Sequence, residues 1–315
     1  MSSYILLERI KVENANALAG FTYGFPAITS FLGFQHVLSL KCKEQFGIEF
    51  TGCAIFCHDY EINSYQQYYT RFIQNRCPPP TLKNTSSGQK RGEKVPIIEE
   101  AKMDMVVSIL LRCNDSLSTN DDVKNSYMTQ LKTWVYQARL SGGTIHHIRK
   151  IHIVDNNLET LKNKVLPSYV LKDASHYLQE HQQYCQEQGI EKTTFDVWTD
   201  FFAFKEQSVQ DDENQTIEWK RIIPPNKKGW IVPLMVGFRR ISPLYQPVQV
   251  ENLRDTRYPF TFVEAIHGLG EWQSSHRITD IETLFWRYDV HDEWYLCTQQ
   301  NVKHQQPVRD TRFED

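Results

Sequence analysis

Cations and aromatic side chains gather in two stretches of this sequence, and single-stranded nucleic acid is bound by that combination. Residues 71–94 hold six Lys or Arg and one acid, and residues 220–240 hold six Lys or Arg and no acid. The aromatic residues in or beside these stretches are Phe72, Trp230, Phe238, Tyr245 and Tyr258. Cations neutralise phosphates, and rings stack on unpaired bases. A solvated loop gives the same pattern about as often, so either stretch alone leaves both interpretations open.

Only scattered residues could do acid–base chemistry. His36 and His58 are the best candidates, because both fall beside the expected sheet in the N-terminal half. Metal-independent RNA cleavage needs little more than one well-placed general base and a group that stabilises charge. The structural alternative, a histidine on a helix and another at a strand end, is the more common case. An endoribonuclease is therefore the second hypothesis rather than the first.

Familiar catalytic, nucleotide-binding and metal-binding motifs are missing from the sequence. It contains no GxxxxGK[ST] phosphate loop, no G-x-S-x-G elbow and no H-E-x-x-H helix. The seven cysteines are scattered, and the close pair Cys53 and Cys57 has no second pair to complete a zinc site. We therefore predict no catalytic residues, no metal and no cofactor.

Composition narrows the class of protein. With 315 residues, 40% of them hydrophobic, the chain can bury a substantial core, which excludes a globally disordered protein. The formal net charge of −3 excludes a uniformly basic nucleic-acid coat protein, although the total averages basic segments against acidic ones. No apolar run approaches the roughly 20 residues that span a bilayer. We expect a soluble, cytoplasmic protein with reduced cysteines and no membrane partner.

Alternating elements in the first half of the chain would position the candidate residues. Apolar residues repeat there at strand or helix spacing, and Gly47 and Ser141-Gly142-Gly143 end the two expected helices. The expected elements are a strand at 4–12, a helix at 26–46, strands at 48–62 and 104–112, a helix at 120–140 and a strand at 144–154. This βαββαβ order is the ferredoxin-like arrangement, which RNA-recognition domains share. The predicted fold class is α+β, with this core over residues 1–155.

An insertion at 63–102 separates two strands of the expected core and carries the first basic stretch. A loop of that length inside a compact domain is usually functional or disordered. Residues 156–216 are expected to form a helical and loop insertion. Its expected parts are two helices within 173–204, broken at Gly189, a mostly polar run at 205–210 and an acidic surface loop at 211–213.

The last part of the chain, residues 217–315, is expected to be β-rich and packed on the core. Its strands are predicted at 217–223, 229–241 and 283–288 from their apolar and aromatic composition. This part holds the second basic stretch, and acids predominate after residue 280. We therefore expect a surface divided by charge, with one side suited to nucleic acid and another to proteins.

Several short sequence words resemble one family of CRISPR proteins. They occur in order and at family-like spacing from residue 14 to residue 277, which is most of the chain. They are Asn14-Ala-Asn-Ala17, Thr22-Tyr-Gly-Phe-Pro26, Phe31-Leu-Gly-Phe34, Arg139-Leu-Ser-Gly-Gly143, Gly229-Trp-Ile-Val-Pro233, Ile241-Ser-Pro-Leu-Tyr245, Phe262-Val-Glu264, Gly268-Leu-Gly-Glu-Trp272 and His276-Arg277. The chain resembles the subunit family of the type I-F CRISPR surveillance complex, the Csy complex, that caps the 5′ end of the guide RNA.

The resemblance implies a RAMP-type protein with an RNA-recognition-like core and an inserted β-hairpin thumb, which the segment 63–102 would form. It implies four partners: the 5′ handle of the guide (CRISPR) RNA, the large subunit, the repeated backbone subunit, and target double-stranded DNA bound through the complex. Such a subunit serves antiviral defence in a Cascade-type ribonucleoprotein without being its nuclease. Related RAMP proteins process repeat RNA with a histidine, which keeps the endoribonuclease hypothesis open.

The expected RNA-binding residues rest on their chemistry rather than on the family. Cations are candidates for phosphate and base-edge contacts, rings for stacking, and glycines for close approach of an RNA backbone. They are Arg71, Arg76 and Lys83 in the insertion, Arg139, Gly142 and Gly143 after the second helix, Arg239, Arg240, Arg254 and Arg257 in the late β region, and the rings of Phe21, Tyr23 and Tyr245.

Overall fold

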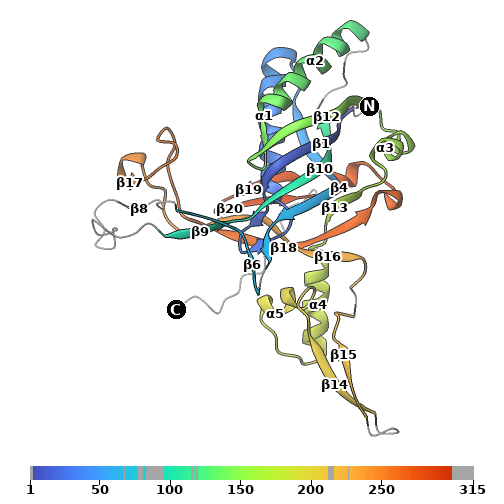
Figure 1. The fold of residues 1–315 in the computed structure, drawn as a ribbon, viewed down its shortest axis with the longest axis vertical. Coiled ribbons are helices and arrows are strands. Elements are labelled where there is room, and N and C mark those ends of the chain that lie inside the picture. The colour runs from blue at the N-terminus through green and yellow to red at the C-terminus, as the bar shows by residue number, and fades with distance from the viewer. Residues whose placement is uncertain are drawn as a thin grey trace.

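A ten-stranded sheet runs through the protein (Figure 1). The computed structural model describes residues 3–66, 68–76, 81–82, 96–114, 117, 120–211, 216–225 and 227–299. Neighbouring strands of the sheet pair antiparallel in the order β11–β12–β1–β10–β4–β13–β18–β16–β20–β19. Their bounds are β1 Tyr4–Asn16, β4 Phe50–Asn63, β10 Lys102–Cys113, β11 Arg139–Leu140, β12 Gly143–Val154, β13 Tyr169–Asp173, β16 Trp230–Arg240, β18 Val263–Ser274, β19 Arg287–His291 and β20 Trp294–Thr298.

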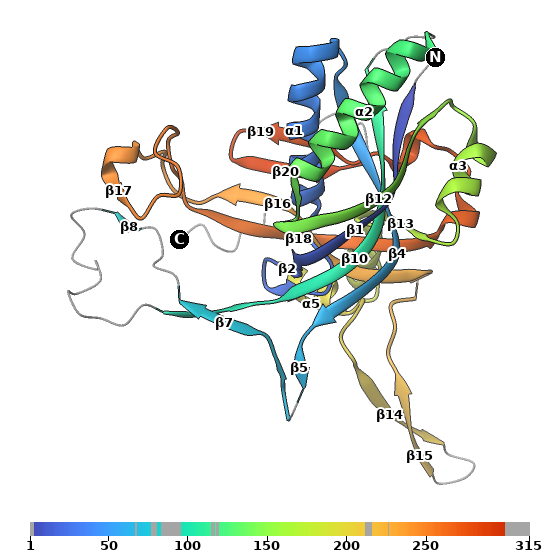
Figure 2. The same ribbon diagram turned by 45° about the horizontal axis from the view of Figure 1, so that its top comes forward.

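Helices cover both faces of this sheet. Side chains of β1 alternate, so that Ile5 and Leu7 join the larger buried cluster while Tyr4 and Leu6 join a smaller one, as the two-residue period of a strand requires. The helices α1 and α2 pack on the larger cluster. The short helix α3 (Leu158–Val165) packs on the smaller one, at the other face (Figures 1 and 2).

The two long helices confirm their predictions. Helix α1 (Ile28–Phe46) ends where Gly47 adopts a left-handed φ of 71° and donates its N–H to the carbonyls of Cys42 and Lys43. Helix α2 (Asp121–Gln137) begins after Asn120, whose side chain accepts hydrogen bonds from two N–H groups of the first turn. Helix α2 ends earlier than predicted, because the next residues pair with β12 as the short strand β11.

The described parts of the insertion at 63–102 form narrow ribbons outside the large sheet. Strand β5 (Tyr65–Gln66) pairs with β6 (Thr70–Arg71), and β7 (Ile73–Arg76) pairs with β9 (Ile97–Glu100). Figure 2 shows this segment reaching away from the sheet towards the loop that carries β17 (Val250–Glu251). Within the region 217–315, strands β16, β18, β19 and β20 continue the same large sheet.

The acidic surface loop expected at 211–213 is wrong for Asp211, which ends a strand, and its other two residues lie outside the described residues; the polar run before it, from Glu206 on, also belongs to that strand. This is strand β14 (Glu206–Asp211), which pairs with β15 (Thr216–Arg221) in a two-stranded hairpin. The hairpin projects from the body of the molecule (Figure 1), and the described side chains at its base are exposed. Glu206, Gln207 and Ser208 of β14 are exposed, and the sequence of the strand lacks the apolar alternation that predicts a strand.

Other differences lie in the second half of the chain. The predicted strand at 283–288 is wrong at its start, where Glu282–Leu284 form a short 3-10 helix and the strand begins at Arg287. Strands β13 and β18 were not predicted. Helices α4 (His176–Glu187) and α5 (Thr194–Thr199) flank Gly189 as expected. Among the helices of the described residues, none is long and apolar enough to cross a membrane.

Candidate nucleic-acid interface

Three of the predicted site residues meet at one open cavity of about 570 Å³. Arg139 and Gly142 reach it from the β11–β12 turn, and Arg254 reaches it from the loop after β17. Polar side chains of Asn16 and Ser30 lie in the same wall. Within the described part of the chain, neither arginine forms an ion pair with an acid. Two guanidinium groups therefore remain available for an anionic ligand at a polar cavity.

The β11–β12 turn is built by residues that tolerate a positive φ. Ser141 and Gly142 have φ values of 51° and 76°, which suits a tight two-residue hairpin. The Ser141 carbonyl accepts a hydrogen bond of 2.8 Å from the N–H of Asn16, which ties the turn to β1. Arg139 donates from Nη1 to the Gly142 carbonyl over 3.2 Å. That single bond orients the guanidinium group and leaves its other N–H donors for a ligand.

Glycine occurs at positions 142 and 143 of this turn for different structural reasons. A side chain at Gly142 would meet nothing within 4 Å, so its outward face is open, as the predicted close approach of an RNA backbone requires. A Cβ at Gly143 would lie 2.8 Å from the backbone of Ala15 and of Glu13. Close packing against β1 is therefore enough to require glycine at position 143, without any contact to RNA.

The inserted segment and the late loop meet through their backbones. Strand β8 (Thr81–Leu82) pairs antiparallel with β17, with Val250 opposite Leu82. Arg71 and Arg76 are exposed on β6 and β7 of the same segment. The predicted residue Lys83 lies outside the described residues. The first basic stretch is thus joined in space to the loop that carries Arg254 and Arg257.

The four predicted arginines of the late region differ in how far protein groups already engage them. Arg239 pairs with Glu293 at 3.0 Å and lies over the ring of Trp294, with 5.0 Å between guanidinium carbon and ring centroid. Arg257 pairs with Asp255 at 2.6 Å. Arg240 is exposed at the end of β16, and neither it nor Arg254 has an acid partner among the described residues. Arg240 and Arg254 are consequently the freer cations.

The three predicted stacking residues differ in how exposed their rings are. Phe21 is 65% exposed, although its ring centroid lies 4.0 Å from that of His267. Tyr23 is 55% exposed and meets Phe72 of the inserted segment edge-on at 5.1 Å. Tyr245 is only partly exposed, and its backbone exchanges hydrogen bonds with Phe260. Phe21 and Tyr23 are therefore the more exposed rings, and Tyr23 is the one that contacts the insertion.

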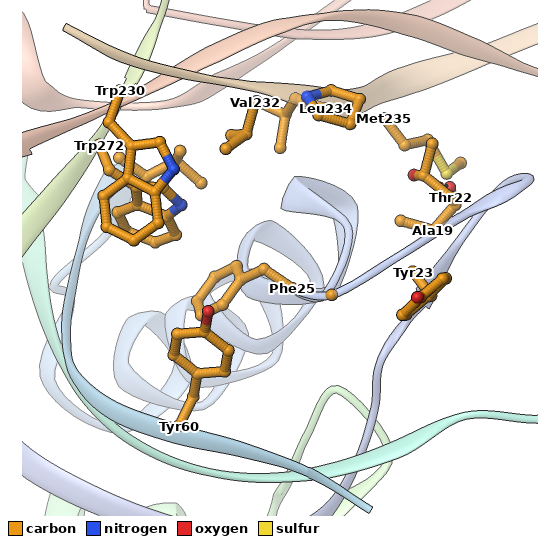
Figure 3. Close-up of a pocket in the computed structure, with 13 residues that line it drawn as sticks. Ala19, Thr22, Tyr23, Phe25, Tyr60, Trp230, Val232, Leu234, Met235 and Trp272 are labelled. Carbon is orange, nitrogen blue, oxygen red and sulfur yellow. Dashed lines mark hydrogen bonds between the residues drawn. The ribbon is translucent and has the colours of Figure 1, made fainter. Parts of the chain in front are cut away.

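Sequence reasoning missed an aromatic cavity next to Tyr23. Figure 3 shows Tyr60, Trp230 and Trp272 around it, from three strands that lie far apart in the chain. Trp272 packs on the buried cluster with only part of its surface exposed. The signal that could have found the site is the presence of the large aromatic residues Tyr60 and Trp230 within two segments predicted as strands.

The two candidate histidines do not form a common site. His58 Nδ1 lies 2.8 Å from the Pro167 carbonyl and must donate to it, so Nε2 accepts from the Ser108 hydroxyl at 2.7 Å. Burial, the largest effect, lowers the pKa of His58. His36 is exposed on α1. Within the described residues no group of three or more His, Cys, Asp or Glu side chains is arranged to hold a metal ion.

Comparison with known proteins identifies the family. A family model described as CRISPR-associated protein (Cas_Csy2) matches residues 5–297. The chain belongs to this family. A Csy2 relative, the CRISPR-associated protein Csy2 of Pseudomonas aeruginosa (strain UCBPP-PA14), is 30% identical over 302 residues, which cover 90% of each protein. The match to the Csy2 family thus includes the ten-stranded sheet, the inserted segment and the late loop together.

Proposed function

We propose that this chain is the non-catalytic subunit of a type I-F CRISPR surveillance (Csy) complex that binds the 5′ handle of the guide RNA. Membership of the Csy2 family supports a role in CRISPR defence. The observation that carries the RNA-binding role is the polar cavity where Arg139 and Arg254 converge beside the open face of Gly142. Phosphate contacts of this kind position an RNA strand and make its affinity depend on salt.

The fold supports the same proposal. Strands β12, β1, β10 and β4 lie side by side in that order, with α1 between β1 and β4 and α2 between β10 and β12 along the chain. That order and connectivity match the ferredoxin-like core of RNA-recognition domains. The inserted segment is the thumb of this proposal, and its pairing with β17 places it beside the loop of Arg254. Fold alone does not assign a function, so the cavity remains the decisive feature.

The proposal includes protein and DNA partners. The subunit pairs with the large subunit, abuts the repeated backbone subunit and helps to position target double-stranded DNA through the complex. Exposed apolar side chains on α1 support a protein interface, since Val37 is 44% and Leu40 is 55% exposed. Adjacent exposed apolar residues of this kind mark surfaces that a partner covers.

The non-catalytic character of this proposal is supported by the state of His58. Both of its ring nitrogens are engaged inside the protein, and a general base needs a free nitrogen within reach of the proton it abstracts. The second hypothesis is a metal-independent endoribonuclease that processes repeat RNA. It depends on His36 or His58 and predicts RNA cleavage that disappears when one of them is replaced.

RNA binding by the full-length chain, purified with its partner subunits, tests the proposal. The probe is repeat-derived handle RNA, titrated at several salt concentrations. We expect Arg139→Ala with Arg254→Ala to weaken binding and to reduce the log–log salt slope by roughly 0.7 for each phosphate that is no longer neutralised. The matched control is Lys11→Ala with Lys43→Ala, which removes two exposed cations that are already paired with Glu13 and Glu49.

Two outcomes would contradict parts of the proposal. If the Arg139 and Arg254 double variant binds handle RNA like the control, the cavity is not a phosphate site. If Arg71, Arg76 and Lys83 are all changed to Ala and binding stays at the wild-type level, the inserted segment is not a major RNA-binding surface.

A further inference from the structure

An aromatic cavity of about 140 Å³ lies between the loop after β1 and the second half of the large sheet. Trp230 and Trp272 are cross-strand partners in β16 and β18, and they form one wall. Phe25 and Tyr60 form a second wall, and Tyr23 lies at the opposite side (Figure 3). The cavity is thus surrounded by aromatic rings from separate parts of the chain.

Three side chains present hydrogen-bond donors to this cavity. Figure 3 places both indole nitrogens and the Tyr60 hydroxyl on the cavity side of their rings. Among the described residues none of these three groups has a hydrogen-bond partner. The indoles of Trp198 and Trp286, in contrast, donate to the carbonyls of Gly268 and Leu171 at 2.8 and 3.0 Å. A ligand that fits this cavity should therefore carry acceptors at the edge of an apolar body.

Size and charge restrict the ligand further. Sites for drug-sized ligands enclose roughly 300–1,000 Å³, so a cavity of about 140 Å³ accepts one ring system rather than a whole cofactor. None of the residues that line it is charged, and a charged group would lose its hydration there without a compensating partner. A flat, uncharged heteroaromatic ring meets both conditions.

The position of the cavity links that ring to a polyanion. Tyr23 of the cavity touches Phe72, the neighbour in sequence of the exposed Arg71. A ring in the cavity would therefore lie next to the basic inserted segment, where a phosphate chain is expected. An apolar side chain of a protein partner would leave the indole N–H groups unpaired, whereas a nucleobase brings carbonyl and ring-nitrogen acceptors.

We propose that this cavity receives one unpaired nucleobase of the RNA, turned out of the strand and held by Trp230, Trp272 and Tyr60. The inference rests on the proposed RNA-binding function and names the part of the RNA that this site recognises. Such capture is common in recognition of single-stranded RNA, where aromatic side chains stack on splayed bases.

Fluorescent RNA tests the inference on the full-length chain purified with its partner subunits. The probes are handle RNAs in which 2-aminopurine replaces one base at a time. We expect one position to change its emission strongly on binding, and Trp230→Ala to abolish that change. An abasic nucleotide at the same position should lower affinity about tenfold, or ~1.4 kcal/mol. Trp230→Ala should weaken the binding of intact RNA by a similar factor. It should not weaken the binding of the abasic RNA further, because both changes remove the same base–ring interaction.

Matched variants separate base capture from loss of folding. Trp219→Ala is the control, since Trp219 is 67% exposed on β15 and does not line the cavity. Tyr60→Phe keeps the ring and removes only the hydroxyl donor, and it should weaken the same RNA position with an unchanged melting temperature. Tyr60 is 48% exposed, so this variant does not disturb the buried core.

Three results would overturn the inference. They are a uniform 2-aminopurine response at all positions, wild-type affinity of the Trp230 and Tyr60 variants for intact RNA, or loss of a protein partner from these variants while their RNA affinity is unchanged. If one of these three results is obtained while the Arg139 and Arg254 variant still loses RNA affinity, the proposed function stands and only base capture fails. If the wild-type chain itself binds no handle RNA, the proposed function fails.

Discussion

The backbone of Val250 pairs with that of Leu82, although one lies in the late loop and the other in the inserted segment. This short antiparallel pairing joins the inserted segment, which carries the first basic stretch, to the loop that carries Arg254 and Arg257. Arg254 follows Val250 closely and lines the polar cavity with Arg139. The pairing therefore connects the inserted segment to the cavity that carries the RNA-binding proposal.

A cysteine pair tests this pairing directly. Residues opposite each other in an antiparallel ladder have Cα atoms about 4.5–5.5 Å apart, which is within the range of a disulfide. We expect Thr81→Cys with Glu251→Cys to cross-link under mild oxidation, as detected by a mobility shift without reductant. The cross-linked protein should bind handle RNA at least as tightly as the reduced form, because its binding surface is already ordered. The control pair is Thr81→Cys with Arg254→Cys, and equal cross-linking of both pairs would contradict the pairing.

The adjacent glycines of the β11–β12 turn should respond differently to alanine. Gly143→Ala places a Cβ 2.8 Å from the backbone of β1, and overpacking of this kind costs about 1–3 kcal/mol. Gly142→Ala has open space and only the strain of its positive φ, which costs about 1 kcal/mol. Urea unfolding of both variants should rank Gly143→Ala as the less stable. The reverse order would show that the turn does not pack on β1 as described.

Asp200 should make the stability of the α4–α5 region depend on pH. Burial alone would raise its pKa, but hydrogen bonds from Lys192, Lys205 and His181 outweigh burial and hold the pKa at about 2. An unfolded Asp titrates near 3.9. The folded pKa is the lower one, so this carboxylate stabilises the folded state above about pH 4, and the contribution disappears as the pH falls towards 2.

Asp200→Asn removes that contribution. At pH 7 the variant should lose about 2 kcal/mol of unfolding free energy, and its difference from wild type should shrink between pH 4 and pH 2. Hydrogen exchange of the α4 and α5 amides measures the effect locally. A matched control is Asp196→Asn at the start of α5, which lacks the lysine hydrogen bonds. A difference that stays constant down to pH 2 would contradict the assignment to Asp200.

The two histidines distinguish a binding subunit from a ribonuclease. We expect wild-type protein to leave repeat RNA intact in EDTA, because His58 has both ring nitrogens engaged and the exposed His36 stands on a helix surface. Gel analysis of end-labelled repeat RNA measures cleavage. If the wild type cuts the RNA and His36→Ala or His58→Ala abolishes cutting, the non-catalytic proposal is wrong.

Periodic segments of the sequence predicted their own structure. Apolar residues at helical spacing and a glycine at position 47 were enough to predict α1, and apolar residues at helical spacing also predicted α2. These signals are local, because a helix forms all its hydrogen bonds within a few residues and its caps lie at its ends. Strands β1, β4 and β10 were equally clear, since they lie in the buried centre of the sheet. Strand β12 lies next to the edge, and it buries Ile145, Ile148 and Ile151.

Strands without a complete buried face were missed. Strand β14 pairs only with β15 in an exposed hairpin, and β18 contains Gly268 and Gly270, which suit close packing rather than strand propensity. In both cases the strand exists because a partner supplies its hydrogen bonds. The sequence of one strand says little about a partner that lies elsewhere in the chain.

The sequence by itself determined the kind of chemistry, which is that of cations beside aromatic rings. It also determined the family, through recognisable words, and the helices and strands of the first half of the chain. Only the tertiary structure decided which candidates meet. Arg139 and Arg254 share one cavity, Arg239 and Arg257 are engaged by acids, and Trp230 faces Tyr60 across a second cavity. Those relationships depend on strand pairing between distant segments, which follows from burial and hydrogen bonding over the whole sheet rather than from any local pattern.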